Sequence, residues 1–463
     1  MGGDKAGSVW AGSGYHTNSN QTGPMDSSTA LSIFESITDR DAVNQRGRAL
    51  GASERTRMVE SYDLVLALLR TTGTGAERTI ATVRRGWEML TGKTIAPSAF
   101  DERFNPGLVR LLWDLFGEVT RPARRALRRR WPRAMQSLRD IVLCDGTRMA
   151  LDAALATVFR GTGEGQAGLK LMAVLSLGQG QLTDVRAGAA VHHDRKLLRL
   201  GELIAGALYL MDLGFYDHSL FAELDDAGAR FVSRLKEGVV PIIESVEAGV
   251  VDARRARGKR LDGALRYHRA VDVDARLRTP DGPEKDRVFR VVKVEVPRCD
   301  RHDQWQGDHH QFWFVTNLPR DVWTPQMIAV LYRLRWAIER AFRQMKTLMR
   351  MDQIRSERPP VIFAFVVASL IVWALGAAVV REMEKERGVG LVSHDRVLAC
   401  VVEGMADVTL TLSRRPDDWN RLLRERLAIF EREGRHPNPS QPRRATTVFE
   451  KVESEARILA QAA

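Results

Sequence analysis

The side chains best suited to chemistry in this sequence lie on one short stretch near residue 340. Residues 331–346 contain neither proline nor glycine, and they include Tyr332, Arg335, Glu339 and Lys346. The composition predicts a helix, and at about 100° per residue the four side chains fall within roughly 60° of its circumference. A carboxylate beside two cations and a phenol suits the binding of a metal ion next to a phosphate group.

Two aspartates elsewhere could complete an acidic site with Glu339. Short apolar runs, typical of buried strands, end directly before Asp145 and Asp212. Three carboxylates suffice to hold two Mg²⁺ ions about 4 Å apart, one activating a nucleophile and the other stabilising the leaving oxygen. We therefore predict that these three side chains converge and bind divalent metal through oxygen ligands alone.

Each of these residues also has an ordinary structural interpretation. Arg335 and Glu339 could form a solvated helical ion pair. An aspartate that precedes glycine, as Asp145 does, often serves a turn. Other aspartates could take the place of Asp212, namely Asp217, Asp225 and Asp226.

The composition indicates a globular protein that binds a polyanion. The 463 residues carry 70 Lys and Arg against 58 Asp and Glu, a formal charge of +12, and 44% of them are hydrophobic. Arginines cluster in residues 121–133, a segment suited to a phosphate backbone. The three cysteines lie far apart, which favours neither a disulfide framework nor a zinc site.

The elements that position these residues follow from the hydrophobic periodicity. Residues 31–133 predict short helices, which suit either a helix-turn-helix-like DNA-binding domain or a plain helical bundle. Residues 138–236 predict strands with one helix over residues 196–207, and residues 237–319 are rich in β-prone segments. The uncharged run at residues 361–380 fits a buried core helix better than a membrane span.

The spacing Tyr-x2-Arg-x3-Glu-x6-Lys, with Trp336 after the arginine and Ile338 before the glutamate, resembles the signature of cut-and-paste DDE transposases of bacterial insertion sequences. The other matches to this family, in chain order, are Asp145-Gly-Thr, Asp212-Leu-Gly-Phe followed by Phe231–Lys236, and Thr316-Asn-Leu-Pro. The resemblance covers about residues 138–380.

This resemblance implies a fold, a catalytic set and a cofactor. The fold would be α/β, with a ribonuclease H-like catalytic domain that carries a mainly β insertion, plus helical N-terminal and C-terminal regions. Asp145, Asp212 and Glu339 would be the catalytic residues and would bind two Mg²⁺ ions per active site, with Mn²⁺ as a substitute. The DNA-binding residues would be Tyr332, Arg335 and Lys346 at a phosphate, Arg343 beside them, and Phe312 or Trp313 under a flipped base.

Simpler roles stand beside some of these assignments. Arg343 could be plain surface charge. Phe312 and Trp313 could fill the core face of a strand, and Trp336 could pack against the insertion rather than the substrate. Extruding a base requires a stacking partner, so a hairpin route depends on one of these aromatic residues.

The domain boundaries and partners complete the prediction. The expected parts are a loosely ordered N-terminus without a signal peptide (1–30), a helical DNA-binding domain with a basic linker (31–133), a catalytic domain (138–236 and 320–385), a mainly β insertion (237–319) and a helical C-terminal region with a possible dimer contact (386–463). The implied partners are double-stranded DNA, at the element ends and at a target, and a second copy of the chain in the synaptic complex. The implied location is the bacterial cytoplasm, at the nucleoid and not in a membrane.

Two rival functions share much of this pattern. A metal-dependent DNA nuclease on the same fold would cut DNA without transferring strands. A DNA-binding repressor would retain the binding surface and lack catalysis, although the three acidic residues argue against that interpretation.

Overall fold

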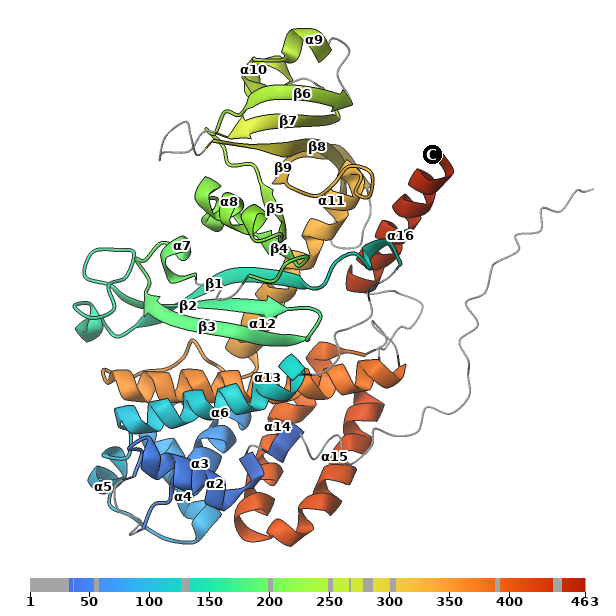
Figure 1. Cartoon of the computed structure of the whole chain (residues 1–463). Coiled ribbons are helices and arrows are strands. Elements are labelled where there is room, and N and C mark those ends of the chain that lie inside the picture. Colours follow the sequence, from blue (N-terminus) through green and yellow to red (C-terminus); the bar gives the residue numbers. More distant parts are fainter. Residues whose placement is uncertain are drawn as a thin grey trace, which may run out of the picture.

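The computed structural model describes residues 33–462, with gaps at 36, 54–57, 126–130, 132, 199–202, 249–252, 266–267, 278–285, 300–304, 388–391 and 436–443. The expected N-terminal segment 1–30 and the middle of the arginine-rich segment lie outside the described residues. In the part described, a nine-stranded sheet crosses the molecule, and long helices cover one face of its first strands (Figure 1).

The sheet combines a parallel centre with antiparallel flanks. Its strand order is β3-β2-β1-β4-β5-β9-β8-β7-β6, and β1, β4 and β5 run parallel. The strands are β1 (Ile141–Leu151), β2 (Ala167–Ser176), β3 (Gln181–Ala189), β4 (Leu208–Met211), β5 (Arg230–Arg234), β6 (Ile242–Ala248), β7 (Val271–Leu277), β8 (Arg287–Cys299) and β9 (Trp305–Thr316). The strands predicted from apolar runs before Asp145 and before Asp212 are confirmed.

The strands of residues 237–319 extend the same sheet. The end of β9 pairs with β5, from Val232↔Thr316 to Arg234↔Phe314. Asn317, from the Thr316-Asn-Leu-Pro motif, fastens this junction: its Oδ1 accepts from the N–H of Phe231 at 2.9 Å, and its Nδ2 donates to the carbonyl of Ala229 at 2.8 Å. The motif therefore joins the β-rich segment to the parallel strands.

The helix predicted over residues 196–207 is wrong in the described part of this range, which leaves out 199–202. A short helix, α7 (Asp194–Leu197), ends early in the range, and residues 203–207 are non-helical and include a turn before β4. Gly206 adopts a left-handed conformation with φ of 76°. Its carbonyl accepts from the N–H of Arg139, and its own N–H donates to the carbonyl of Gly228. These bonds to neighbouring segments replace the bonds that a helix would make.

The predicted signature helix is present but interrupted. It consists of α11 (Pro325–Tyr332), a 3-10 turn (Arg333–Arg335) and α12 (Trp336–Thr347). Thr324 caps α11 by accepting from the N–H of Met327 at 3.2 Å. The interruption lies between Tyr332 and Glu339, so the expected uniform angle between these side chains is not kept.

A layer of helices packs below β1–β3 (Figure 1). Its centre is α13 (Pro359–Arg387), whose neighbours are α3 (Ser61–Gly73), α6 (Pro106–Arg125) and α14 (His394–Arg414). A window within Pro359–Lys385 is apolar enough to cross a membrane, but 83% of it is buried inside the protein. This helix is therefore an interior element, as the sequence predicts for residues 361–380, rather than a membrane span.

The N-terminal and C-terminal helices form one bundle around α13. α14 packs against α3 and α4 as well as against α13 and α15, and α16 packs against α11. The helices of these regions are α2 (Arg40–Ala49), α3 (Ser61–Gly73), α4 (Ile80–Thr91), α5 (Pro97–Asp101), α6 (Pro106–Arg125), α14 (His394–Arg414), α15 (Trp419–Glu433) and α16 (Arg444–Ala462). Short helices on the other side of the sheet or in the insertion are α8 (His218–Asp226), α9 (Ala253–Ala256) and α10 (Leu261–Ala264).

Two apolar clusters lie on opposite faces of the sheet. One contains Leu143 and Leu210 together with residues of α11, α12 and the helical bundle. The other contains Cys144 and Met211 together with residues of α8 and the insertion. Consecutive strand residues lie in different clusters because side chains alternate between the two faces of a sheet. The same alternation determines the face on which the residues after Cys144 and Met211 lie.

Candidate active site

The register of the central strands places Asp145 beside Asp212. β1 and β4 pair in parallel up to Cys144 and Met211, so the two aspartates are the next residues in the same register. β4 ends at Met211, whereas β1 continues beside β2 as far as Leu151. Asp145 thus lies inside its strand rather than at its end, at the point where the two parallel strands separate.

Both aspartates belong to the face of the sheet that carries α12. Leu143 and Leu210 lie in the apolar cluster on that face, and the next residue of each strand lies in the other cluster. Because side chains alternate along a strand, Asp145 and Asp212 lie on the same face of the sheet as Leu143 and Leu210. Both aspartates are partly buried.

Tyr332 connects the signature helix to the second aspartate. Its hydroxyl donates to the carbonyl of Met211 at 3.2 Å and lies 3.5 Å from Oδ1 of Asp212. The guanidinium of Arg335 lies 5.7 Å from the centre of the tyrosine ring. Burial raises the pKa of Tyr332, so the phenol stays protonated and keeps its hydrogen for donation.

Lys346 connects α12 to β1, and Arg335 pairs with Glu339 along the helix. Nη1 of Arg335 lies 2.6 Å from Oε1 of Glu339, and Nζ of Lys346 donates to the carbonyl of Arg148 at 3.0 Å. The Arg335 side chain is 11% exposed, and its buried Nε makes no hydrogen bond. Since Arg148 follows Asp145 on β1, these contacts bring the face of α12 that carries Glu339 to the acidic end of the strands.

The charges of the site act on one another. The pKa of Asp145 is raised to about 6, chiefly by burial and further by the negative charges of Glu339 and Asp212. The N–H of Gly146 and the guanidinium of Arg335 act in the opposite direction. Burial lowers the pKa of Arg335, but the phenol and the carboxylates around it outweigh this and leave the pKa raised. Three carboxylates thus share one nearby guanidinium.

The acidic residues do not form a complete metal-binding site in this arrangement. Among the residues that the structure describes, no three His, Cys, Asp or Glu side chains are gathered closely enough to hold an ion as they stand. Glu339 is paired with Arg335, and Oδ1 of Asp145 accepts from the N–H of Gly146 at 2.8 Å. A cation bound by these carboxylates would have to replace Arg335 as the partner of Glu339.

Comparison with known proteins identifies the family of the chain. The family model described as "Transposase DDE domain" matches residues 136–375, about half of the chain. The chain belongs to this family of DDE transposases.

Curated relatives of this transposase come from bacterial insertion sequences. It is 22% identical over 351 residues to the transposase for insertion sequence element IS231E of Bacillus thuringiensis subsp. finitimus, covering 67% of this chain and 72% of that protein. The transposase for IS231B of Bacillus thuringiensis subsp. berliner is 18% identical over 432 residues, covering 85% and 89%. The putative transposase InsL for IS186A of Escherichia coli (strain K12) is 39% identical over 88 residues, covering 19% and 21%.

A solved structure also matches most of the chain. It is a cryo-EM structure of the piggyBac transposase synaptic complex with hairpin DNA, with a TM-score of 0.42 and 12% identity. The match covers 88% of this chain and 85% of that chain.

The competing aspartates of this transposase have other partners. Asp217 caps α8 by accepting from the N–H of Ser219 at 2.9 Å, and it pairs with Arg195. Asp225 accepts from Asn317 at 2.7 Å, and Asp226 pairs with Arg287 at 3.5 Å. These contacts support Asp212 as the second acidic residue of the site.

Phe312 and Trp313 lie on opposite faces of the sheet. Phe312 packs against the cluster on the side of α12, and the Arg234 guanidinium lies 5.2 Å from its ring centre. Trp313 packs against the other cluster, with Nζ of Lys293 5.2 Å from its ring. Phe314 lies 6.2 Å from Phe312 and 5.2 Å from the ring of Tyr332. Only Phe312 of the predicted pair therefore shares a face with the acidic residues.

Two further side chains of α12 point outward. Trp336 is 50% exposed, so at least half of its surface is not used in packing. Arg343 is exposed as well. Both are accessible to a ligand that approaches the helix, which keeps the predicted DNA contact of Arg343 open.

An arginine from the N-terminal helices fixes the far end of α12. Arg78 is buried, and its Nε donates to the carbonyl of Met349 at 3.0 Å. It also donates to the carbonyls of Thr71 and Thr72 at the end of α3. Burial lowers the pKa of Arg78 to about 10, and the positive charge of Arg350 adds to that effect. The sequence pattern contains no local signal for this contact.

A buried ion pair near the aspartates was also missed. Nζ of Lys170, on β2, lies 2.6 Å from Oδ1 of Asp194, on α7. A lysine inside the apolar run of residues 168–177 is the signal that could have revealed it, because an isolated charge in a buried strand requires a partner.

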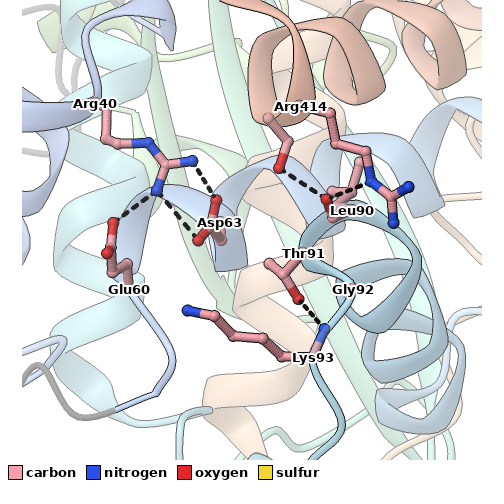
Figure 2. A pocket seen from close by; sticks show the side chains of 9 residues that line it. Arg40, Glu60, Asp63, Leu90, Thr91, Gly92, Lys93 and Arg414 are labelled. Atoms are coloured by element: carbon pink, nitrogen blue, oxygen red, sulfur yellow. Dashed lines mark hydrogen bonds and ion pairs between the residues drawn. The ribbon is translucent and has the colours of Figure 1, made fainter.

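A cavity in the helical bundle contains a second group of charges (Figure 2). Arg40 bridges Glu60 at 2.7 Å and Asp63 at 2.8 Å. Lys93 and Arg414 line the same cavity, and Nε of Arg414 donates to a backbone carbonyl of α4. The cavity lies between the helices around α3 and α14, apart from the acidic residues of the sheet.

Proposed function

We propose that this transposase cleaves DNA at the ends of its element and transfers the 3′ ends to a target, using Asp145, Asp212 and Glu339 as its acidic residues. The observation that carries the proposal is the β1–β4 register, which sets the two aspartates side by side facing the helix of Glu339. The contact of Tyr332 with Asp212 and the bond of Lys346 to the carbonyl of Arg148 link the signature helix to the strands.

The donor set fits two divalent cations such as Mg²⁺, with Mn²⁺ as a substitute. The three candidate ligands are hard oxygen donors, as these ions prefer. The raised pKa of Asp145 reflects burial and negative charge that one guanidinium leaves uncompensated. When bound, such ions supply activation of a nucleophile and stabilisation of a leaving oxygen at a phosphodiester.

The cationic residues of α12 would hold the phosphate beside the cut. Arg335 keeps a buried Nε without a hydrogen bond, and guanidinium groups bind phosphate oxygens in pairs. If Glu339 served as a metal ligand, the donors of Arg335 that now pair with it would be free for the phosphate. Lys346, now bonded only to a backbone carbonyl, adds a point charge, and Tyr332 donates one hydrogen bond.

Phe312 is the better of the two candidates for stacking on an extruded base. It lies in line with Phe314 and Tyr332 on the face of the acidic residues, whereas Trp313 faces away. The adjacent Arg234 guanidinium would supply charge for the neighbouring phosphate. We expect loss of Phe312, and not of Trp313, to reduce cleavage if excision uses a hairpin.

The decisive experiment uses DNA bearing the element ends, identified from the inverted repeats that flank the gene. Wild type with Mg²⁺ should nick these ends and join them to a plasmid, and two chains should assemble on paired ends. Glu339→Gln should bind the ends and produce neither product, while Glu382→Gln serves as a matched control on α13. Cleavage without joined product would favour the nuclease alternative, and end binding without cleavage by wild type would favour the repressor.

A further inference from the structure

A buried lysine, Lys170, lies within β2, a strand that is buried along its whole length. Lys170 is on β2, between β1 and β3, and is 2% exposed. Its Nζ donates to Oδ1 of Asp194 at 2.6 Å and to the carbonyl of His192. A buried ammonium is retained in such a place only when its charge is matched, so the position of the Asp194 carboxylate is fixed by the strand beneath it.

The Asp194 carboxylate fits against two glycines that follow the catalytic aspartates. A Cβ atom placed on Gly214 would lie 2.6 Å from Oδ2 of Asp194, and one placed on Gly146 would lie 3.4 Å from its Oδ1. Gly146 directly follows Asp145 and Gly214 lies just beyond Asp212. The carboxylate therefore lies close to both chain segments that carry the acidic residues of the site, and closer to the segment of Gly214.

The contact is made from the reverse face of the sheet. Gly146 alternates with Asp145 along β1, so it faces away from α12. α7, which carries Asp194, packs against the 3-10 turn Leu213–Phe215. In Figure 1, α7 lies on the side of the sheet opposite to α13.

Backbone pairing holds Asp145, which stays in the ladder between β1 and β2, but it does not extend to Asp212, which follows the end of β4. The parallel ladder between β1 and β4 ends at Cys144 and Met211, one residue before Asp145 and Asp212. Beyond that point the chains separate, and a tightly packed contact is needed to define their spacing.

We propose that Lys170 and Asp194 form a positioning pair that sets the spacing of Asp145 and Asp212 from behind the sheet, and so tunes the affinity of the site for divalent metal. This inference rests on the proposed function. Neither residue reaches the reacting atoms; Lys170 fixes Asp194, and Asp194 fixes the segments that contain Gly146 and Gly214. Partners of this kind change metal affinity by about 10- to 100-fold in other sites.

The test is a cycle that combines Gly214→Ala with removal of the ion pair. In the wild-type background, the added methyl group meets the Asp194 carboxylate, and we expect Mn²⁺ affinity to fall by about 10-fold or more. In a Lys170→Met/Asp194→Ser background, the pair is removed without an orphaned charge and the space is free. There we expect weakened Mn²⁺ binding with little added loss from Gly214→Ala.

The primary measurement is Mn²⁺ binding to the full chain, followed by the electron paramagnetic resonance signal of free Mn²⁺, with thermal melting and end-DNA binding as controls. Equal loss from Gly214→Ala in both backgrounds, or unchanged Mn²⁺ affinity in the Lys170→Met/Asp194→Ser variant, would overturn the positioning role. Asp145→Asn separates this failure from that of the proposed function. If wild type binds no Mn²⁺, or if Asp145→Asn binds it as tightly, the metal site itself is wrong.

Discussion

The acidic end of the central strands and the cavity of the helical bundle contain similar side chains in different balance. In the cavity, Arg40 bridges Glu60 and Asp63, and Lys93 adds a second positive charge (Figure 2). Burial leaves the pKa of Asp63 raised, although Arg40 and Lys93 act in the opposite direction. Burial raises the pKa of Glu60, but hydrogen bonds from Asn44 and Arg40 outweigh it, and the net pKa is lowered.

At the acidic end of the central strands, negative charges outnumber the positive charges beside them. Asp145, Asp212 and Glu339 have one guanidinium among them, and the pKa of Asp145 is raised to about 6 by burial and by its acidic neighbours. The comparison indicates that a group of carboxylates supports stability when cations match it, and suits a cationic ligand when it carries surplus negative charge. The following expectations test this contrast, from the largest effect to the smallest.

Asp145→Asn should separate activity from stability. We expect end cleavage to fall by at least about 1,000-fold, roughly 4 kcal/mol of transition-state stabilisation, while the metal-free protein melts at the same or a higher temperature. The physical reason is that the substitution removes a metal ligand and also one surplus negative charge. A large drop in melting temperature together with the lost cleavage would show that Asp145 is a structural residue.

The free energy of unfolding of the metal-free protein should depend on pH through the protonation of Asp145. Its folded pKa, about 6, lies above the ordinary 3.8, so the folded state holds the proton more tightly. Above pH 6 its contribution is destabilising, by at most about 3 kcal/mol, and stability should rise as pH falls from about 6 toward 4. Comparing urea unfolding of wild type and Asp145→Asn isolates this effect, because the difference between them should close over that window.

Arg335→Lys should weaken catalysis without unfolding the chain. Lysine keeps the charge and loses the paired donors, so we expect cleavage to fall by about 30-fold, roughly 2 kcal/mol. Arg343→Lys, on the exposed side of the same helix, is the matched control and should change cleavage by less than about 3-fold. Equal effects of the two substitutions would argue that general positive charge, rather than the geometry at Arg335, is what matters.

The cavity should respond in the opposite sense. Glu60→Gln removes a carboxylate that accepts from Arg40 and Asn44 and whose pKa is lowered, and we expect a loss of about 1 kcal/mol in the free energy of unfolding. Cleavage per folded molecule should stay unchanged, because the cavity is remote from the strands. Chemical unfolding and single-turnover cleavage measured on the same preparation check both halves of this expectation.

The sequence predicted those elements that depend only on residues close together in the chain. The apolar runs before Asp145 and Asp212, and the helix of Glu339, follow from neighbouring residues alone, and the structure has these elements. The 3-10 turn after Tyr332 could not be foreseen, because the helix-forming composition continues through it. The failure at residues 196–207 has a similar origin, since Gly206 bonds to segments distant in sequence.

The partners in contacts between distant segments could not be predicted: Lys170 in an apolar run indicates that it needs a partner, but not that Asp194 is that partner. The pairing of Lys170 with Asp194, and the bonds of Arg78 to the end of α12, depend on how strands and helices pack. The bundle of N-terminal and C-terminal helices around α13 likewise follows from packing rather than from periodicity. For the candidate site, the sequence named the acidic residues, and the structure supplied the residues that surround and support them.

The position of α13 has a practical consequence for anyone who shortens this protein. The family-matched residues 136–375 end inside this helix and leave out α3, α6 and α14, which cover it. A fragment cut at those limits would expose an apolar helix to water and would lose the bond from Arg78 to the end of α12. Such a fragment should aggregate or require detergent, although the intact chain buries the same helix in its interior.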